Sequence, residues 1–436
     1  MTIATGVVSR GAPRERPVAD DLMVAARRLL WVAVLCTMTA PRIELGSVHF
    51  TLGDVLAELS AACWLASWAL APSRPMLVRA AFWPLAILGV SVVSAASSIN
   101  MGATGVGLVE LTILWVLPAL LVPNLVSSPP RVRDFLTCVS AGSLIAAGMN
   151  IVEALRVGTV DGGLPQVWGA VQYFQGYFQV VGLIIAVSRL MNSVASKRPL
   201  SAFSWVIACM LNAIALLLTQ TRGAWLAALA AMVVLGIAWR PVVLIGAIGV
   251  LSIGVLAFWG AGWTGIVGER VQSIFTLQAG LEGFESSIGR LALAVTAWQI
   301  FLAHPLLGVG LKNFPLAMPV YAPSGMPLAY EMGRDRVLTA VEGPHNTYLR
   351  LLSEIGVLGL VGLVGWQADS MRRFYQESRA NRSVDHPFGT HPAVLLAAAT
   401  VIAVYNFFFE MTQTGMLIFI AVLSLAYSTR SFQRVR

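Results

Sequence analysis

Long apolar runs separated by short polar turns occupy most of the chain, and this alternation predicts the fold. A helix needs about 20 apolar residues to cross the hydrocarbon core of a bilayer. The strands of a membrane β-barrel would instead alternate polar and apolar positions. The runs here are continuously apolar, which predicts an all-α integral membrane protein. The twelve predicted spans are 28–46, 52–71, 78–98, 104–125, 134–155, 168–191, 201–219, 222–239, 241–260, 346–366, 391–410 and 413–430.

The composition favours the same class of protein. Hydrophobic residues make up 57% of the chain and charged residues only 11%, whereas a soluble domain carries about 25% charged residues. The four cysteines lie far apart in apolar runs, and the five histidines show no zinc-binding spacing. We therefore expect free thiols and no metal site.

The distribution of positive charge predicts the orientation in the membrane. Of the 29 lysines and arginines, 20 fall in the two tails and in the alternate loops that share their side. By the positive-inside rule both termini are cytoplasmic. The cytoplasmic parts would be the tails 1–27 and 431–436 and the loop 367–390. The net charge of +8 then reflects topology and does not indicate nucleic-acid binding.

One large segment is expected on the outer side, at residues 261–344, between spans one to nine (28–260) and spans ten to twelve (345–430). Within it, a helix is predicted from Ile288 to about Ala303, capped by the preceding serines. Its apolar side would consist of Leu291, Val295, Trp298 and Leu302. Such an amphipathic helix is expected to lie on the membrane or over the helix bundle.

Polar residues on the outer side fall in three short motifs. The first is Thr-Gln-Thr-Arg-Gly-Ala-Trp-Leu, which begins at Thr219 and contains Arg222. The second is Ser-Ile-Gly-Arg290, followed by Trp298 and by His-Pro-Leu-Leu-Gly-Val-Gly at 304–310. The third begins with His345 and Asn346 and continues to Glu354, Gly356 and Gly359.

In this order the three motifs resemble the O-antigen ligase and polymerase superfamily of bacterial envelope glycosyltransferases, over roughly residues 215–365. The resemblance implies a ligase in the bacterial inner membrane, with its active site facing the periplasm. Its donor would be O-antigen linked to undecaprenyl pyrophosphate, and its acceptor a sugar hydroxyl of lipid A–core. The transfer would be inverting and metal-independent, without a cofactor. The functional arginines and histidine of the family correspond to Arg222, Arg290 and His345.

Each of these residues has a physical role that fits such chemistry. Arg222 opens a helix at its outer end, where the N–H groups and the helix dipole favour a phosphate. Arg290 could supply a second clamp on the same pyrophosphate. His345 could activate or orient the acceptor hydroxyl. The alternatives are a snorkelling arginine, a solvated arginine and a helix-capping histidine, respectively.

Several further polar residues are possible supports of the site. Asn346 is expected to cap the helix that follows, and Glu410 could orient one of the arginines. Lys312, Arg334 and Arg336 could contact acidic lipid or core phosphates, or simply be solvated. Glu354 would lie deeper along the helix as the partner of a buried arginine or polar group. The repeated glycines 356, 359, 362 and 365 predict a face for close helix packing.

Three other functions remain open from the sequence. An O-antigen polymerase would use the same donor with a lipid-linked acceptor, and a protein O-oligosaccharyltransferase would use a protein acceptor. A lipid-linked glycan flippase would require ionisable residues spread through the spans, broken helices at mid-membrane, or inverted repeats. The ligase is favoured because the single large outer loop directly precedes the His345 helix.

Overall fold

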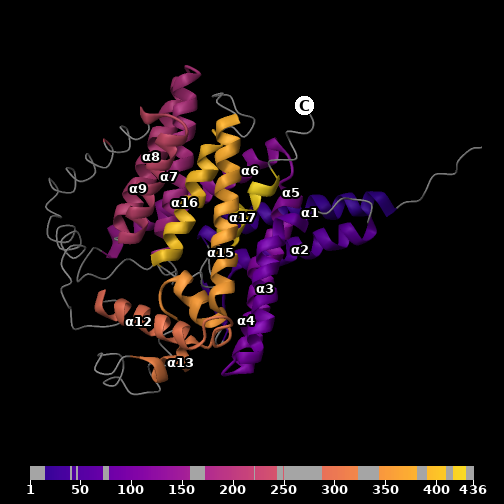
Figure 1. Cartoon of the computed structure of the whole chain (residues 1–436). Helices are drawn as coiled ribbons and strands as arrows, with labels where there is room; N and C mark the ends of the chain where they lie inside the picture. The colour runs from indigo at the N-terminus through magenta and orange to yellow at the C-terminus, as the bar shows by residue number, and fades with distance from the viewer. Residues whose placement is uncertain are drawn as a thin grey trace, which may run out of the picture.

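A computed structural model describes residues 15–39, 42–45, 48–71, 78–157, 172–219, 221–242, 249, 287–322, 343–380, 390–408 and 416–428. These residues are almost entirely helical (Figure 1). The exception is one antiparallel hairpin of two short strands, β1 (Arg42–Leu45) and β2 (Val48–Thr51). The predicted all-α class is therefore correct apart from this hairpin.

The helices of the first half are α1 (Glu15–Thr39), α2 (Leu52–Leu70), α3 (Phe82–Ser94), α4 (Met101–Leu111), α5 (Leu117–Leu125) and α6 (Pro129–Val157). A single π-helical segment at Thr112–Val116 joins α4 to α5. Those of the second half are α7 (Gln172–Ala195), α8 (Pro199–Leu218), α9 (Arg222–Ala238), α12 (Ser287–Ala303), α13 (Phe314–Tyr321), α15 (Thr347–Ala380), α16 (Ala393–Phe408) and α17 (Met416–Ser428).

Seven helical segments are long and apolar enough to cross a membrane, which makes this a multi-pass membrane protein. They are Val18–Thr39, Arg79–Ser97, Met101–Leu125, Pro129–Arg156, Gly176–Ala195, Pro199–Leu218 and Thr347–Ala380. Shorter apolar helices occupy three other predicted spans, at Gly223–Ala238, Ala393–Phe408 and Met416–Ser428. The total of twelve stays a prediction, because α2, at the predicted span 52–71, is not among these apolar segments, and the predicted span 241–260 lies almost wholly outside the described residues.

The first helix is displaced from its predicted position. α1 begins at Glu15 rather than at residue 28, and it ends at Thr39, ahead of the hairpin. The helix includes the charged residues near its start because Ala19, Ala26 and Leu30 form a buried stripe at helical spacing. Hydroxyls of α2 hold this stripe: Ser67 donates to the Ala19 carbonyl at 2.6 Å and Ser60 to the Ala26 carbonyl at 2.7 Å. Figure 1 shows this pair running across the direction of α15.

The short helices α16 and α17 lie at the centre of the bundle. Nearly every residue of α17, and most residues of α16, are buried. A helix that is apolar all round can face either lipid or protein, and the burial of these two shows that other helices surround them. Aromatic rings fill the contact with α7: Tyr177 packs edge-on against Tyr405 with ring centroids 4.4 Å apart, and Tyr405 contacts Phe419 at 4.8 Å.

The long helix α15 is broken at Gly356, so span ten is not the straight helix that the sequence predicts. Gly356 has φ 74° and ψ −171°, far from helical values. In a continuous helix, Tyr348 and Gln367 would be about 28 Å apart at 1.5 Å per residue. Instead, the Tyr348 hydroxyl donates to the Gln367 side-chain oxygen at 2.7 Å. The segment before Gly356 therefore folds back against the segment after it.

A loop fills the break in α15 and pairs with it through backbone hydrogen bonds. The Val309 and Gly310 N–H groups donate to the carbonyls of Ser353 and Glu354, at 3.1 and 2.8 Å. In return, the Val357 N–H donates to the Pro305 carbonyl at 2.9 Å. These bonds satisfy backbone groups that the interrupted helix would otherwise leave buried without partners.

A third segment, the turn between α3 and α4, also contacts this loop. Hydroxyls of Ser94 and Ser97 donate to the carbonyls of Leu307 and Gly308. The side chain of Asn313 donates to the Thr104 hydroxyl at 2.7 Å and accepts from the Asn100 N–H at 2.8 Å. We call the three segments together, residues 94–104, 304–314 and 353–357, the junction.

The glycines of the predicted packing face have different roles. A Cβ at Gly362 would lie 2.6 Å from the Ile87 side chain, and one at Gly365 would overlap Trp83, so these two permit close packing on α3 as expected. Gly356 instead allows the break. Its backbone has a positive φ, and a Cβ there would overlap the Leu306 carbonyl.

Substitution of Gly356 by alanine is expected to destabilise the protein by at least about 2 kcal/mol, because it adds backbone strain to a steric overlap. The midpoint of thermal unfolding of the purified protein in detergent measures this change. Gly105→Ala is the matched control, because Gly105 lies in α4 with open space around its Cβ position. The control should unfold at the same or a higher temperature. Equal midpoints for both variants would contradict the role assigned to the break.

Candidate functional site

The turn between α8 and α9 presents Arg222 as the first residue of α9. Hydrogen bonds within the turn fix its shape: Thr219 donates to the Leu216 carbonyl at 2.7 Å, and Thr221 donates to the Thr219 carbonyl at 3.1 Å. The Trp225 indole also donates to the Leu216 carbonyl, at 3.1 Å. No side chain caps the N-terminus of α9 within the described part of the chain. The backbone of Arg222 thus lies at a helix N-terminus suited to an anion.

The start of α9 is packed closely by α7 and α16 because residue 223 is glycine. A Cβ on Gly223 would lie 2.6 Å from the Tyr177 hydroxyl and 3.0 Å from Phe408. Gly176 allows the reciprocal approach, since its Cβ would lie 3.0 Å from that of Ala224. The first turn of α9 is therefore held against the start of α7 and the end of α16.

Tyr177 connects this turn to Arg290. The tyrosine is fully buried, its hydroxyl lies next to the Gly223 backbone, and the Arg290 guanidinium lies close enough for its charge to act on the phenol. Arg290 lies in the first turn of α12 and is half-buried. The turn of Arg222 and the side chain of Arg290 thus both lie near one aromatic side chain that the sequence analysis did not single out.

His345 and Asn346 form the entry to α15. His345 is half-buried and has a left-handed backbone, with φ 52°. The Asn346 side chain accepts from the Leu349 N–H at 3.0 Å, so the predicted helix cap is confirmed. The same amide donates to the Phe407 carbonyl at 2.7 Å. This bond ties the residue after His345 to the C-terminal end of α16.

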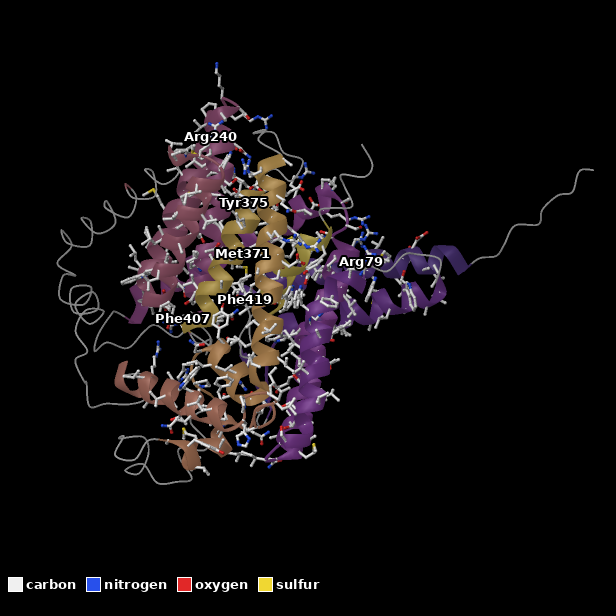
Figure 2. All side chains as sticks on the ribbon, viewed as in Figure 1. Arg79, Arg240, Met371, Tyr375, Phe407 and Phe419 are labelled. Atoms are coloured by element: carbon white, nitrogen blue, oxygen red, sulfur yellow. The ribbon has the colours of Figure 1, made fainter. Side chains whose placement is uncertain are left out.

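The three predicted residues therefore gather at one end of the bundle, around the end of α16. Phe408 contacts the turn of Arg222, Phe407 accepts from Asn346, and Tyr177 lies between that turn and Arg290. Figure 2 shows Phe407 at this end and Arg240 at the opposite end. Such an arrangement can present positive charge and a histidine to a substrate at a single face.

Glu354 has the internal partners that were expected. Its carboxylate pairs with Arg350 at 3.2 Å and accepts from the Phe314 N–H at 3.3 Å, and its side chain is 1% exposed. The helical rise from Thr347 to Glu354 stays as expected, because the break at Gly356 comes after Glu354, but this segment folds back against the rest of α15 and does not continue straight into the span. Glu354 belongs to the junction, where it fastens the loop to α15.

Lys312 forms an ion pair with Glu110 on α4, with 2.6 Å between nitrogen and oxygen. Both side chains are mostly buried, at 22% and 18% exposure. The pair joins the loop after α12 to a candidate membrane span. The suggested contact of Lys312 with a substrate phosphate stays a prediction, and in this conformation its charge is already paired.

Three predicted supporting residues, Arg334, Arg336 and Glu410, lie outside the described residues, as does the side chain of Arg222.

Sequence reasoning missed Tyr177, Phe407 and Phe408, because apolar and aromatic residues in a span are ordinarily read as core. The available signal was the run of glutamines around Tyr177, at 172, 175 and 179, which interrupts the apolar pattern.

Comparison with known families supports the class of protein that the fold and these residues suggest, a multi-pass membrane glycosyltransferase of the O-antigen ligase and polymerase type. Residues 207–364 match the family model described as O-antigen ligase. The match is less than half of the chain, but it contains Arg222, Arg290, His345 and two of the three segments of the junction. The resemblance seen in the sequence is thereby confirmed, and lipid-linked polysaccharides are the general class of substrate. No curated protein matches the chain.

Two substitutions of Asn346 distinguish the contributions of its two hydrogen bonds, one to the Leu349 N–H and one to the Phe407 carbonyl. Asn346→Ala removes both and should cost about 2 kcal/mol of stability. Asn346→Asp keeps the oxygen that caps the helix but cannot donate to the Phe407 carbonyl, so it should cost about half as much. Thermal unfolding midpoints of the two variants test this order. An aspartate variant as unstable as the alanine variant would show that the cap contributes nothing.

A double-mutant cycle tests the ion pair of Lys312 and Glu110. Lys312→Met and Glu110→Gln should each destabilise the protein, because each leaves a mostly buried charge without its partner. The double variant should lose less than the sum, with a coupling energy of about 1–2 kcal/mol. Unfolding midpoints of the four proteins give the coupling. A coupling near zero would contradict the structural role and favour Lys312 as a substrate contact.

Proposed function

We propose that this protein is an O-antigen ligase. It transfers a polysaccharide from undecaprenyl pyrophosphate to a sugar hydroxyl of lipid A–core, at the periplasmic face of the bacterial inner membrane. The observation that carries the proposal is the family match over 207–364 together with the placement of its three motifs at one end of the bundle.

The two arginines are assigned to the donor. Arg222 begins α9, whose N-terminal N–H groups have no side-chain cap among the described residues, and Arg290 is linked to the same turn through Tyr177. A guanidinium forms paired, charge-assisted hydrogen bonds with phosphate oxygens. Together the two would hold the pyrophosphate and stabilise its negative charge as it leaves.

His345 is assigned to the acceptor. In the proposed step, the acceptor hydroxyl oxygen attacks the anomeric carbon while the bond from that carbon to the pyrophosphate oxygen breaks. The bonding electrons leave with the pyrophosphate, the anomeric centre inverts, and the hydroxyl proton passes to the His345 ring or to a base oriented by it. The glycosyl phosphate is already an activated donor, so the step needs no cofactor.

The charge distribution supports the proposed orientation. Arg240, one of the 20 basic residues that the positive-inside argument places in the cytoplasm, lies at the end of the bundle opposite Phe407 (Figure 2). The end with Arg290 and His345 would then face the periplasm. That is the side on which lipid-linked O-antigen is available to a ligase.

A transfer assay with purified components tests the proposal. The protein is mixed with undecaprenyl-pyrophosphate-linked glycan and lipid A–core in the presence of EDTA. His345→Ala and Arg290→Ala should each lower the transfer rate by about 100-fold or more. Arg372→Ala is the matched control, because Arg372 is an exposed arginine of α15 paired with Asp369, away from the three motifs. It should change the rate less than about two-fold.

The products distinguish the proposed function from its alternatives. Glycan-decorated lipid A–core made by the unmutated protein supports the ligase. Longer glycans on undecaprenyl pyrophosphate, with unmodified lipid A–core, would identify a polymerase instead. Glycan on a protein acceptor alone would indicate an O-oligosaccharyltransferase. Movement of the donor across a vesicle membrane without any transfer would indicate a flippase.

A further inference from the structure

Helix α12 has an apolar face that no described segment covers. Its buried face packs against α13 and α15 through Ala292, Leu293, Ala297 and Ile300. The opposite side exposes Leu291, Trp298 and Leu302, at 55%, 49% and 61%. The sequence placed these last residues, with Val295, on the apolar side, but left open whether that side met the bundle or the membrane. In the structure, the side of α12 that contacts protein is the opposite one, with Ala292, Leu293, Ala297 and Ile300.

The exposed side of α12 is unsuited to water. Residues 291–303 of the helix include no charged side chain, although a helix at a protein–water boundary ordinarily carries charged or polar residues on its outer side. The apolar surface also continues past the end of the helix to Leu306, which is 64% exposed. A tryptophan within an apolar stripe is typical of the boundary between lipid and water.

Both ends of α12 lie at the depth where membrane spans end. At its start, Arg290 lies near Tyr177, the second residue of the candidate span Gly176–Ala195. Just after its end, the loop bonds to the last residues of the candidate span Arg79–Ser97, through Ser94 to Leu307 and Ser97 to Gly308. The helix therefore runs across the end of the bundle, as Figure 1 shows, and remains near a single depth.

Apolar residues are also exposed where the α3 span ends, next to the loop that follows α12. The Ile99 N–H donates to the Val309 carbonyl at 3.2 Å, which places the end of the α3 span beside the loop. There Val92, Val93, Ile99 and Met101 are exposed at 54–62%. Exposed apolar residues at the end of a span face lipid, so the loop that follows α12 lies beside a lipid-facing surface.

We propose that the face of α12 formed by Leu291, Val295, Trp298 and Leu302 is inserted in the bilayer, in the leaflet at the end of the bundle that holds His345. The partner is the boundary between acyl chains and headgroups. Insertion does not depend on the proposed function. If that function is correct, insertion holds Arg290 at headgroup depth, where the pyrophosphate of a lipid-linked donor lies.

Site-directed spin labelling of the full-length protein in nanodiscs tests this proposal. Single cysteines are introduced at 291, 298 and 302 in a background in which the four native cysteines are replaced by alanine. Collision rates of each label are measured with oxygen, which partitions into lipid, and with a water-soluble nickel chelate. Ser196→Cys, in the exposed turn between α7 and α8, is the aqueous reference. Ala297→Cys reports the buried face.

Insertion predicts an oxygen-to-nickel collision ratio at 298 and 302 about three-fold or more above that at 196. The label at 297 should be inaccessible to both reagents. A ratio at 298 and 302 equal to that at 196 would show that water covers the face, and would overturn the proposal. Low collision rates with both reagents at these positions would overturn it as well, because another part of the chain or a second copy would then cover the face. Transfer activity of the labelled proteins is recorded separately, so that loss of the proposed function does not affect this result.

Discussion

The backbone pairing between the loop at 305–310 and the broken helix at 353–357 is the constraint on which this end of the molecule depends. A transmembrane helix normally satisfies its own N–H and C=O groups. Here the helix stops at Gly356, and the freed groups pair with a loop from elsewhere in the sequence. Because unpaired backbone groups are costly away from water, neither the loop nor the break would be stable without the other.

Two parts of the candidate site follow from this pairing. The fold-back of α15 brings Tyr348 against Gln367 and Ala403, and so places Asn346 at the end of α16. The loop meanwhile fixes the end of α12, the helix that carries Arg290 at its other end. The third part, the turn of Arg222, reaches the same place through α7 and α16, because Gly223 admits the Tyr177 hydroxyl and Phe408. Residues from three distant motifs are thus positioned by contacts among their neighbours.

The membrane explains why polar groups are concentrated here. In the interior of the bundle, serines, threonines and asparagines mostly bond to carbonyls one turn away or on an adjacent helix, as Ser60 and Ser67 do with α1. At the junction, by contrast, Ser94, Ser97, Asn313 and Glu354 bond across three segments. A loop at membrane depth requires such partners, since lipid offers none. The motif residues Gly308, Glu354 and Gly356 are accounted for by this structural requirement, which leaves Arg222, Arg290 and His345 as the residues assigned to chemistry.

The class of the protein and the approximate place of most helices follow from the sequence alone, because a span of about 20 apolar residues is a local property set by bilayer thickness. The sequence also showed a resemblance to the O-antigen ligase family through the order of its three motifs, and the family match over 207–364 supports this resemblance. It could not determine that α15 is broken, since Gly356 is compatible with a packing face as well as with a break until Leu306 is placed against it. Nor could it show that Lys312 pairs with Glu110, that Tyr177 lies between two motifs, or which side of α12 meets protein. Each of these depends on contacts between segments far apart in the chain, and only tertiary packing specifies them.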